Sequence, residues 1–189
     1  MYPWIRIAKA ALSTARKSRV ELLSTTRVCM RVWPNDLDFN LHVNNGRYLT
    51  LADIGRMDWF VRTSLWEVAR QEKALPVVGD AIAKFRKELG AFQKFCIDTR
   101  MLGWDERWGF IEHRFVREGR VLGVVAIRGV FKGANGPVKP SSLLAKLGVN
   151  IESPTLPQWI NEWNSGCESL SQLLRSEEQE RGVRNDVMK

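Results

Sequence analysis

Residues 46–64 form a helical pattern whose apolar side chains extend well beyond a single stripe, and four strand patterns follow it. A helix that is apolar around most of its surface is expected to be surrounded by protein. The strand patterns are joined by hairpin-length connections, which favour antiparallel neighbours. They cover residues 77–89, 92–102, 108–117 and 121–132. With a further alternating segment at 25–33, the sequence predicts an α+β fold, in which an antiparallel sheet of about five strands wraps around a long central helix.

The remaining segments flank this central part. Residues 1–23 predict a basic amphipathic helical arm, residues 24–133 the main domain, and residues 134–189 a C-terminal helical extension. We expect the extension to hold helices at 141–147 and 156–175, followed by a frayed, charged tail. The second face and the edges of the sheet need cover, so we expect a homo-oligomer, either a dimer or a tetramer.

Composition limits the kinds of partner. With 189 residues, 44% of them hydrophobic and 26% charged, the chain has the balance of one soluble globular domain. The formal net charge of +8 favours anionic partners, but no nucleic-acid-binding signature is present, so we expect no nucleic acid. Cys29, Cys96 and Cys167 show no metal or redox spacing and predict reduced thiols in a cytoplasmic protein. No apolar run is long enough to span a membrane.

The N-terminal arm has two interpretations. Residues 1–20 carry five basic and no acidic side chains, and residues 4–19 follow an amphipathic helical pattern. A basic amphipathic helix can lie on a membrane surface, which gives a weak membrane contact through residues 4–19. We favour the simpler interpretation, a helical arm packed on the domain.

A polar loop separates the first strand from the central helix. The turn at 34–36 stops the strand, because proline lacks a donor and Asn and Asp bond their own backbone. Asn44 and Asn45 offer side-chain oxygens to cap the helix that starts there. Between these two features, three side chains capable of chemistry occur at a spacing of two: Asp38, Asn40 and His42. This arrangement indicates an active-site loop that leads into a helix N-terminus.

Each residue of this loop also has a purely structural interpretation. Asp38 on its own would be a turn aspartate, and Asn40 a loop-closing amide. For His42 we leave open whether it takes part in the reaction or locks the loop through its backbone partners. We expect Asn44 to act chiefly as a cap and Tyr48 to lie in the core beside a pocket. Asp36 is assigned to the turn, and His113, isolated in a strand pattern, to structure rather than to a metal site.

The string Asp-Leu-Asp-Phe-Asn-Leu-His-Val-Asn-Asn-Gly-Arg-Tyr-Leu at 36–49, with the strand before it and the helix and strands after it, resembles a known family. Over residues 24–133 the chain is similar to hot-dog-fold acyl-CoA thioesterases of the 4-hydroxybenzoyl-CoA thioesterase-like superfamily. The string also resembles the corresponding segment of plant acyl carrier protein thioesterases.

The resemblance implies a cofactor-free thioesterase that hydrolyses acyl-CoA, or an acyl carrier protein thioester, at a dimer interface. In the family, the aspartate at the position of Asp38 is the nucleophile or the general base, and the plant enzymes' set matches Asp38, Asn40 and His42. A backbone N–H near Asn45 and Gly46 would polarise the carbonyl, and Asn44, Asn45, Gly46 and Tyr48 are the expected substrate contacts. The alternative function is a catalytically weak hot-dog protein that binds acyl chains or a partner, associated with a membrane surface. The length of the acyl chain of the substrate stays open.

Overall fold

The computed structural model describes residues 4–14 and 17–187. The chain divides into two compact units, residues 1–154 and 155–189. Helices of the first unit are α1 (Trp4–Thr14), α2 (Asn45–Arg62), α3 (Leu65–Gln71) and α4 (Pro140–Lys146), with a short 3-10 helix at Pro34–Asp36. The second unit holds the long helix α5 (Gln158–Val187). None of the helices in the described ranges is both long and apolar enough to cross a membrane.

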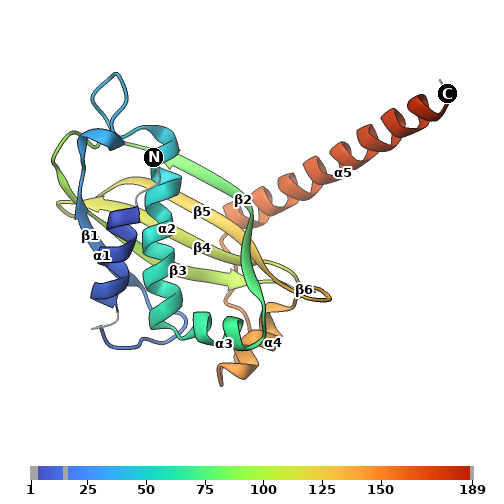
Figure 1. The fold of residues 1–189 in the computed structure, drawn as a ribbon, viewed down its shortest axis with the longest axis horizontal. Coiled ribbons are helices and arrows are strands. Elements are labelled where there is room, and N and C mark those ends of the chain that lie inside the picture. The colour runs from blue at the N-terminus through green and yellow to red at the C-terminus, as the bar shows by residue number, and fades with distance from the viewer. Residues whose placement is uncertain (1–3, 15–16, 188–189) are drawn as a thin grey trace. The chain divides into compact units, whose positions relative to one another are not determined.

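One antiparallel sheet curls around α2, as Figure 1 shows. Its strands are β1 (Thr26–Arg31), β2 (Leu75–Phe85), β3 (Lys94–Trp104), β4 (Gly109–Arg117), β5 (Arg120–Gly133) and β6 (Gly136–Val138). They lie in the order β1-β3-β4-β5-β2, and the short β6 pairs with β5. The predicted α+β fold, a sheet around a central helix, is confirmed. The short β6 adds a sixth strand to the five that periodicity indicated.

Alternation along the strands decides which side chains face α2. In β3, Phe95, Ile97 and Thr99 are buried, while the residues between them are partly exposed. The helix approaches the sheet closely at Gly55, where a Cβ would lie 2.5 Å from Oγ1 of Thr99 and 2.9 Å from Cγ2 of Ile97. A larger residue at position 55 would therefore push α2 away from the sheet that it fills.

The packed interpretation of the N-terminal arm is confirmed, because polar side chains of this segment bind carboxylates buried in the body. Arg6 donates to Oδ2 of Asp36 at 2.6 Å, and the Thr14 hydroxyl donates to Oδ1 of Asp58, also at 2.6 Å. Just beyond α1, Lys17 lies 2.8 Å from the same oxygen of Asp58.

Three large apolar side chains of α1 are nevertheless exposed, whereas its Ile7 and Ala10 pack against the core. Trp4, Ile5 and Leu12 are 69%, 86% and 70% exposed. A helix packed on a domain normally turns its polar side to water, so these three side chains are an exception to the usual pattern.

The structure extends α5 to Val187, beyond the predicted helix end at residue 175. The stretch after Arg175 is rich in Glu, Gln and Arg, which are good helix formers. Within it, Arg181 lies 4.0 Å from Glu177, the residue one helical turn earlier. The helix propensity of these residues accounts for the longer helix.

The expectation of reduced thiols is wrong for two of the three cysteines. Cys29 of β1 lies directly opposite Cys96 of β3, their Cα atoms are 3.9 Å apart, and the two form a disulfide. Cys167 forms no disulfide within the described residues. The sequence could not show this bond, because 67 residues separate the two cysteines and periodicity does not say which strands pair. The expected cytoplasmic location loses the ground that Cys29 and Cys96 gave it.

Opening this disulfide is expected to lower stability substantially. A cross-link over so long a loop restricts the unfolded chain and contributes on the order of 4 kcal/mol in the chain-entropy model. We expect a Cys29→Ser, Cys96→Ser double variant to melt roughly 10 °C lower than the oxidised protein, as followed by circular dichroism. Cys167→Ser is the matched control and should melt with the wild type. Equal melting of the oxidised and the double-serine protein would contradict this expectation.

Candidate active-site cleft

The loop between β1 and α2 is a tight hairpin. Leu37 and Val43 form an isolated antiparallel bridge, and the Asp38 N–H donates to the His42 carbonyl at 2.9 Å. The Leu41 N–H donates back to the Asp38 carbonyl at 3.1 Å, and Leu41 takes a left-handed backbone with φ of 60°. This closure holds the side chains of Asp38, Asn40 and His42 on one short turn.

Asp36 anchors the base of this loop. Its side chain is fully buried and accepts hydrogen bonds from Arg6, from Arg47 at 2.8 Å and from the Trp33 N–H at 2.9 Å. Its carbonyl also accepts from the Asn44 N–H at 2.8 Å. The sequence assigned Asp36 to a turn, and the 3-10 helix does end at this residue. The sequence did not predict that Arg6 and Arg47 would pair with its carboxylate. Burial by itself would raise the pKa of Asp36; the hydrogen bonds from Arg6, the Trp33 N–H and Arg47 outweigh it and hold that pKa below its usual value.

The start of α2 confirms the predicted cap. Asn44 is the N-cap, and its Oδ1 accepts the Gly46 N–H at 2.9 Å. This bond occupies one of the two N–H groups expected near the carbonyl of a substrate. The N–H of Asn45 forms no hydrogen bond within the described ranges, so it is the donor left at the positive end of the α2 dipole.

Most of the predicted site residues line one cleft of about 340 Å³. The loop and the first turns of α2 contribute Asp38, Asn40, His42, Asn45 and Tyr48. The opposite wall is the end of β2 and the segment after it, with Phe85, Arg86, Lys87, Glu88 and Leu89. Asn44 and Gly46 do not line the cleft, because they form the cap behind it. The structure therefore brings five of the seven expected site residues together.

Asp38 has both a structural and a cleft-facing role. Its Oδ1 accepts the Asn40 N–H at 2.9 Å, which is the turn bond that the sequence suggested. Its second carboxylate oxygen accepts no hydrogen bond from any residue that the structure describes. The carboxylate is half-buried, so one oxygen is fixed while the other stays available in the cleft.

Glu88 is a cleft residue that sequence reasoning missed. Nε2 of His42 lies 3.0 Å from its carboxylate, and His42 also forms a backbone bridge with Gly90. The two residues are 46 positions apart, and only the pairing of the loop with the segment after β2 brings them together. The pair gives His42 a defined orientation at the mouth of the cleft.

Tyr48 is a core residue that reaches the cleft, as expected. It is 3% exposed, and its ring lies 4.7 Å from that of Phe115 and 5.1 Å from that of Phe85. Burial raises the pKa of its hydroxyl. The cleft floor next to Asp38 is therefore aromatic.

A second, more apolar cavity of about 430 Å³ lies further along α2. Its walls combine α1, α2 and α3 with strands of the sheet, and they include Ile7, Met57, Phe60, Trp66 and Val77. An ion pair between Asp53 and Arg56 of α2 lies at its border. None of the predicted site residues lines this cavity, although it offers more apolar wall than the cleft does.

His113 lies outside both cavities, in agreement with its structural assignment. It is fully buried in β4, and its Nδ1 lies 3.0 Å from the Thr99 hydroxyl. Burial, with a smaller contribution from the charge of Arg56, lowers the pKa of His113 well below 6.5. No group of His, Cys, Asp and Glu side chains within the described ranges has the arrangement of a metal site.

The buried His113 predicts a pH dependence of stability. Below pH 6.5 the unfolded chain protonates this histidine while the folded protein does not, so stability falls as the pH decreases. The slope approaches about 1.4 kcal/mol per pH unit for one proton. We expect the melting temperature of wild type to fall between pH 7 and pH 5.5, and that of His113→Gln to fall much less, as measured by calorimetry. Parallel curves for the two proteins would exclude His113 as the source.

Comparisons with known proteins agree with this architecture. A family model described as the thioesterase-like superfamily matches residues 32–164. Protein THEM6 of Xenopus laevis is 34% identical over 157 residues, which cover 82% of this chain and 73% of that protein. A probable thioesterase of Saccharomyces cerevisiae is 28% identical over 123 residues, 63% of this chain and 53% of that protein.

A solved structure shows the same fold. That of a gentisyl-coenzyme A thioesterase aligns with a TM-score of 0.53 at 20% identity, covering 64% of this chain and 98% of the other. The hot-dog resemblance drawn from residues 24–133 is thus confirmed, and the family match extends past it at the C-terminal side. The loop, the capped helix and the curled sheet, together with these matches, show that the chain belongs to the thioesterase-like superfamily.

Proposed function

We propose that this protein hydrolyses acyl-CoA thioesters to the free acid and CoA, with Asp38 as nucleophile or general base. The observation that carries the proposal is the convergence of Asp38, His42 and the N-terminus of α2 on one cleft. Membership of the thioesterase-like superfamily supports thioester hydrolysis in general. The acyl-CoA substrate and the part of Asp38 are our inference from the cleft.

The chemistry follows from the groups that face the cleft. A carboxylate oxygen of Asp38 attacks the thioester carbonyl, or takes a proton from the attacking water. Negative charge then develops on the carbonyl oxygen, and the Asn45 N–H at the positive end of α2 stabilises it. His42, oriented by Glu88, is placed to exchange the proton that the departing thiolate needs. Asn40 faces the same space and can hold the water or the carbonyl.

The charges of the opposite wall suit coenzyme A. Arg86 and Lys87 follow β2 and line the cleft together with Asp38. Two cations at the opening provide contacts for the phosphates of CoA, and equally for the phosphopantetheine of an acyl carrier protein. The aromatic floor at Tyr48 and Phe85 would receive the first part of the acyl group.

A homodimer is part of the proposal. β2 closes one side of the sheet, with β5 as its neighbour, so its outer edge offers free backbone groups. Several of its apolar side chains are also exposed, namely Leu75, Val77, Val78, Ile82 and Phe85. Pairing of two copies along β2 would cover both features and place α2 of each copy near the cleft of the other. Light scattering after gel filtration distinguishes dimer, tetramer and monomer, and a monomeric wild type would refute this part.

The activity itself is tested with a panel of acyl-CoA substrates. Purified protein is incubated with aromatic, short-chain and long-chain acyl-CoAs, and released CoA is trapped with a thiol reagent. We expect turnover that is saturable and needs no added metal or cofactor. The same panel as acyl carrier protein thioesters identifies the preferred carrier. Tight binding of acyl-CoA with no release of thiol from any substrate would instead support the binding-protein alternative.

A further inference from the structure

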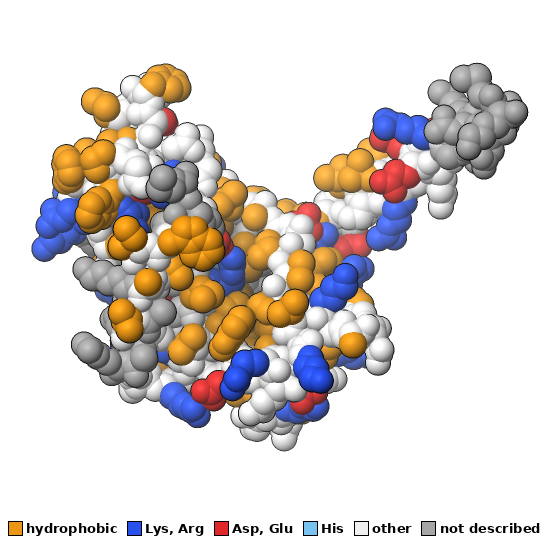
Figure 2. Space-filling view, viewed as in Figure 1, with side chains coloured by type: hydrophobic (Ala, Val, Ile, Leu, Met, Phe, Trp, Pro, Cys, Tyr) orange, Lys and Arg blue, Asp and Glu red, His pale blue; other side chains and the backbone are white. Residues whose placement is uncertain are grey.

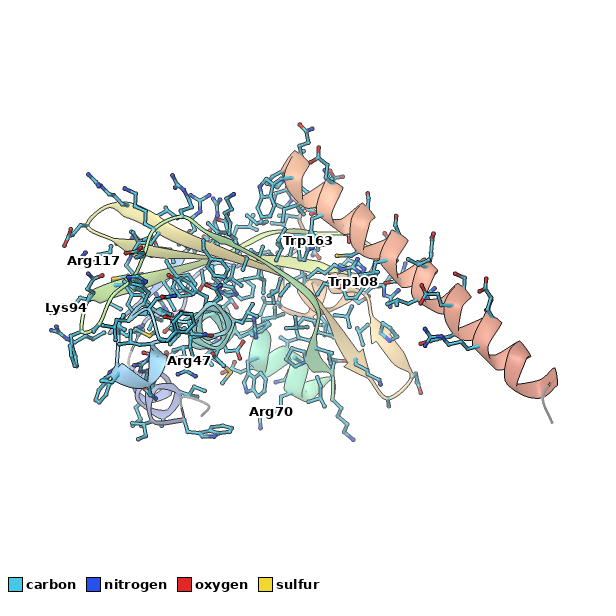
Figure 3. All side chains as sticks on the ribbon, turned by 90° about the horizontal axis from the view of Figure 1, so that it is seen from above. Arg47, Arg70, Lys94, Trp108, Arg117 and Trp163 are labelled. Atoms are coloured by element: carbon cyan, nitrogen blue, oxygen red, sulfur yellow. A yellow bond between two sulfur atoms is a disulfide. The ribbon has the colours of Figure 1, made fainter. Side chains whose placement is uncertain are left out.

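Several strands end together at one end of the sheet, and they define a surface that we call the rim. Register pairs Arg31 at the end of β1 with Lys94 at the start of β3, and Arg117 with Arg120 across the β4–β5 turn. We define the rim as residues 31–33, 37–43, 85–94 and 117–120. Figure 3 shows Lys94 and Arg117 at this same end of the sheet. The cleft of Asp38 opens on the rim, since Asp38, His42 and residues 85–89 of the rim line it.

The rim exposes large apolar side chains on separate loops. Phe39 is 93% exposed and Leu41 is 69% exposed at the hairpin tip, while Trp33 and Phe92 are 58% and 59% exposed. The backbones of Leu41 and Phe92 are both left-handed, with φ of 60° and 59°, a conformation that large side chains rarely adopt. Two strained positions therefore hold bulky apolar groups out in solvent, where the hydrophobic effect opposes them. Figure 2 shows apolar side chains gathered on the hairpin loop and around α1.

Cations lie between these apolar groups. Five exposed basic residues belong to the rim: Arg31, Arg86, Lys87, Lys94 and Arg120. Arg31 and Arg86 donate to backbone carbonyls, and within the described part of the chain none of the five forms an ion pair. The exposed acids of the rim are already engaged, Glu88 with His42 and Glu118 with Arg117. The rim therefore presents a net positive charge.

Helix α1 contributes to the same end of the molecule. Arg6 binds Asp36 at the base of the hairpin and lies 5.8 Å above the ring of Trp33. This contact places the first turn of α1, with the exposed Ile5, beside the rim, while the Trp4 side chain lines the second cavity. Because Arg6 and Lys17 are engaged with buried carboxylates, they are not directed outward as a basic anchor helix would require. The exposed cations lie on the strand ends instead.

We infer that the rim is a docking surface for an anionic lipid bilayer. Aromatic and aliphatic side chains on separate loop tips can enter the interfacial layer, where Trp and Phe are favoured, while the cations between them meet lipid phosphates. A protein partner would require a flatter surface, on which apolar groups form one continuous core. The mouth of the Asp38 cleft would then face the bilayer, from which a long acyl chain can enter. Lipid binding is independent of the chemistry proposed for Asp38.

Co-sedimentation with vesicles tests the inference. Full-length protein is mixed with phosphatidylcholine vesicles that contain or lack phosphatidylserine, and bound and free fractions are measured. We expect binding that requires phosphatidylserine and weakens with salt. The Lys87→Gln, Lys94→Gln variant should bind at least tenfold more weakly, because each cation near an anionic surface contributes about a fivefold factor. We expect Phe39→Ser, Phe92→Ser to lose binding by on the order of tenfold or more.

Matched controls separate this effect from general changes. Lys132→Gln and Ile151→Ser remove one exposed cation and one exposed apolar group outside the rim. Both controls should bind like the wild type, and thermal melts confirm that every variant is folded. The inference fails if the wild type does not bind phosphatidylserine vesicles, or if rim and control variants bind equally. It also fails if the rim variants change only the oligomeric state or only the capture of acyl carrier protein.

Discussion

The Asp38→Asn variant is expected to lose about 10²–10⁴-fold in kcat on the best acyl-CoA, with a much smaller change in KM. Asparagine keeps the size of the side chain and can still accept the Asn40 N–H that closes the turn. It removes the negative oxygen that would attack the carbonyl or take a proton from water. A loss confined to kcat means that the group acts in the transition state rather than in binding. Single-turnover and steady-state kinetics measure the two parameters.

Asp98→Asn is the matched control for this experiment. Asp98 makes an ion pair with Arg27 between β3 and β1, outside the cleft, so the same chemical change there should leave kcat near wild type. Equal CoA release by wild type and Asp38→Asn would exclude Asp38 as the catalyst. A single turnover in oxygen-18 water then separates the two mechanisms, since label enters Asp38 only if an acyl anhydride with its carboxylate has formed.

The Asp36→Asn variant is expected to lose roughly 3–5 kcal/mol of folding free energy, the cost of breaking a buried ion pair by removing one partner. Arg6 and Arg47 would keep their charges in a buried site without the carboxylate between them. We expect the melting temperature to fall by roughly 10 °C. Chemical denaturation followed by tryptophan fluorescence measures the change. Asp98→Asn again serves as control, because its ion pair with Arg27 is largely exposed and should matter little.

The pH dependence of this variant gives a second, independent measurement. The pKa of Asp36 is depressed in the folded protein, so its ion pairs stabilise the fold above its unfolded pKa of about 3.8. This contribution is lost as the pH falls through the still lower folded pKa. The stability difference between wild type and Asp36→Asn should therefore be constant near neutral pH and shrink below pH 3.8. A difference that is small and independent of pH would show that Asp36 does not hold the two arginines.

The parts of the fold that could be predicted are those encoded in local periodicity. The strand pattern at 92–102 predicted β3, in which Phe95, Ile97 and Thr99 are buried, and the apolar breadth of residues 46–64 indicated a helix enclosed by the sheet. The turn at 34–36 and the Asn44 cap also follow from residue types within a few positions of one another. These features depend on neighbours in sequence, so a single chain reveals them.

The parts that escaped prediction join distant segments. Glu88 meets His42, Cys29 bonds Cys96, and Arg6 reaches Asp36 only because separate elements pack side by side. Periodicity identifies the face on which a residue lies, but it does not say which other element covers that face. The site was therefore predicted as a loop, whereas the opposite wall of the cleft needed the structure.

The polar contacts of the N-terminal arm with the body of the domain also decide how short a fragment can still fold. The family match starts at residue 32, which would suggest that the domain folds without the N-terminal arm. Asp36 and Asp58, however, are buried carboxylates whose partners include Arg6, Thr14 and Lys17. A shortened protein that starts at residue 24 would keep both acids and lose these three partners. We expect it to be recovered mainly in aggregates, so the smallest piece worth expressing includes the arm.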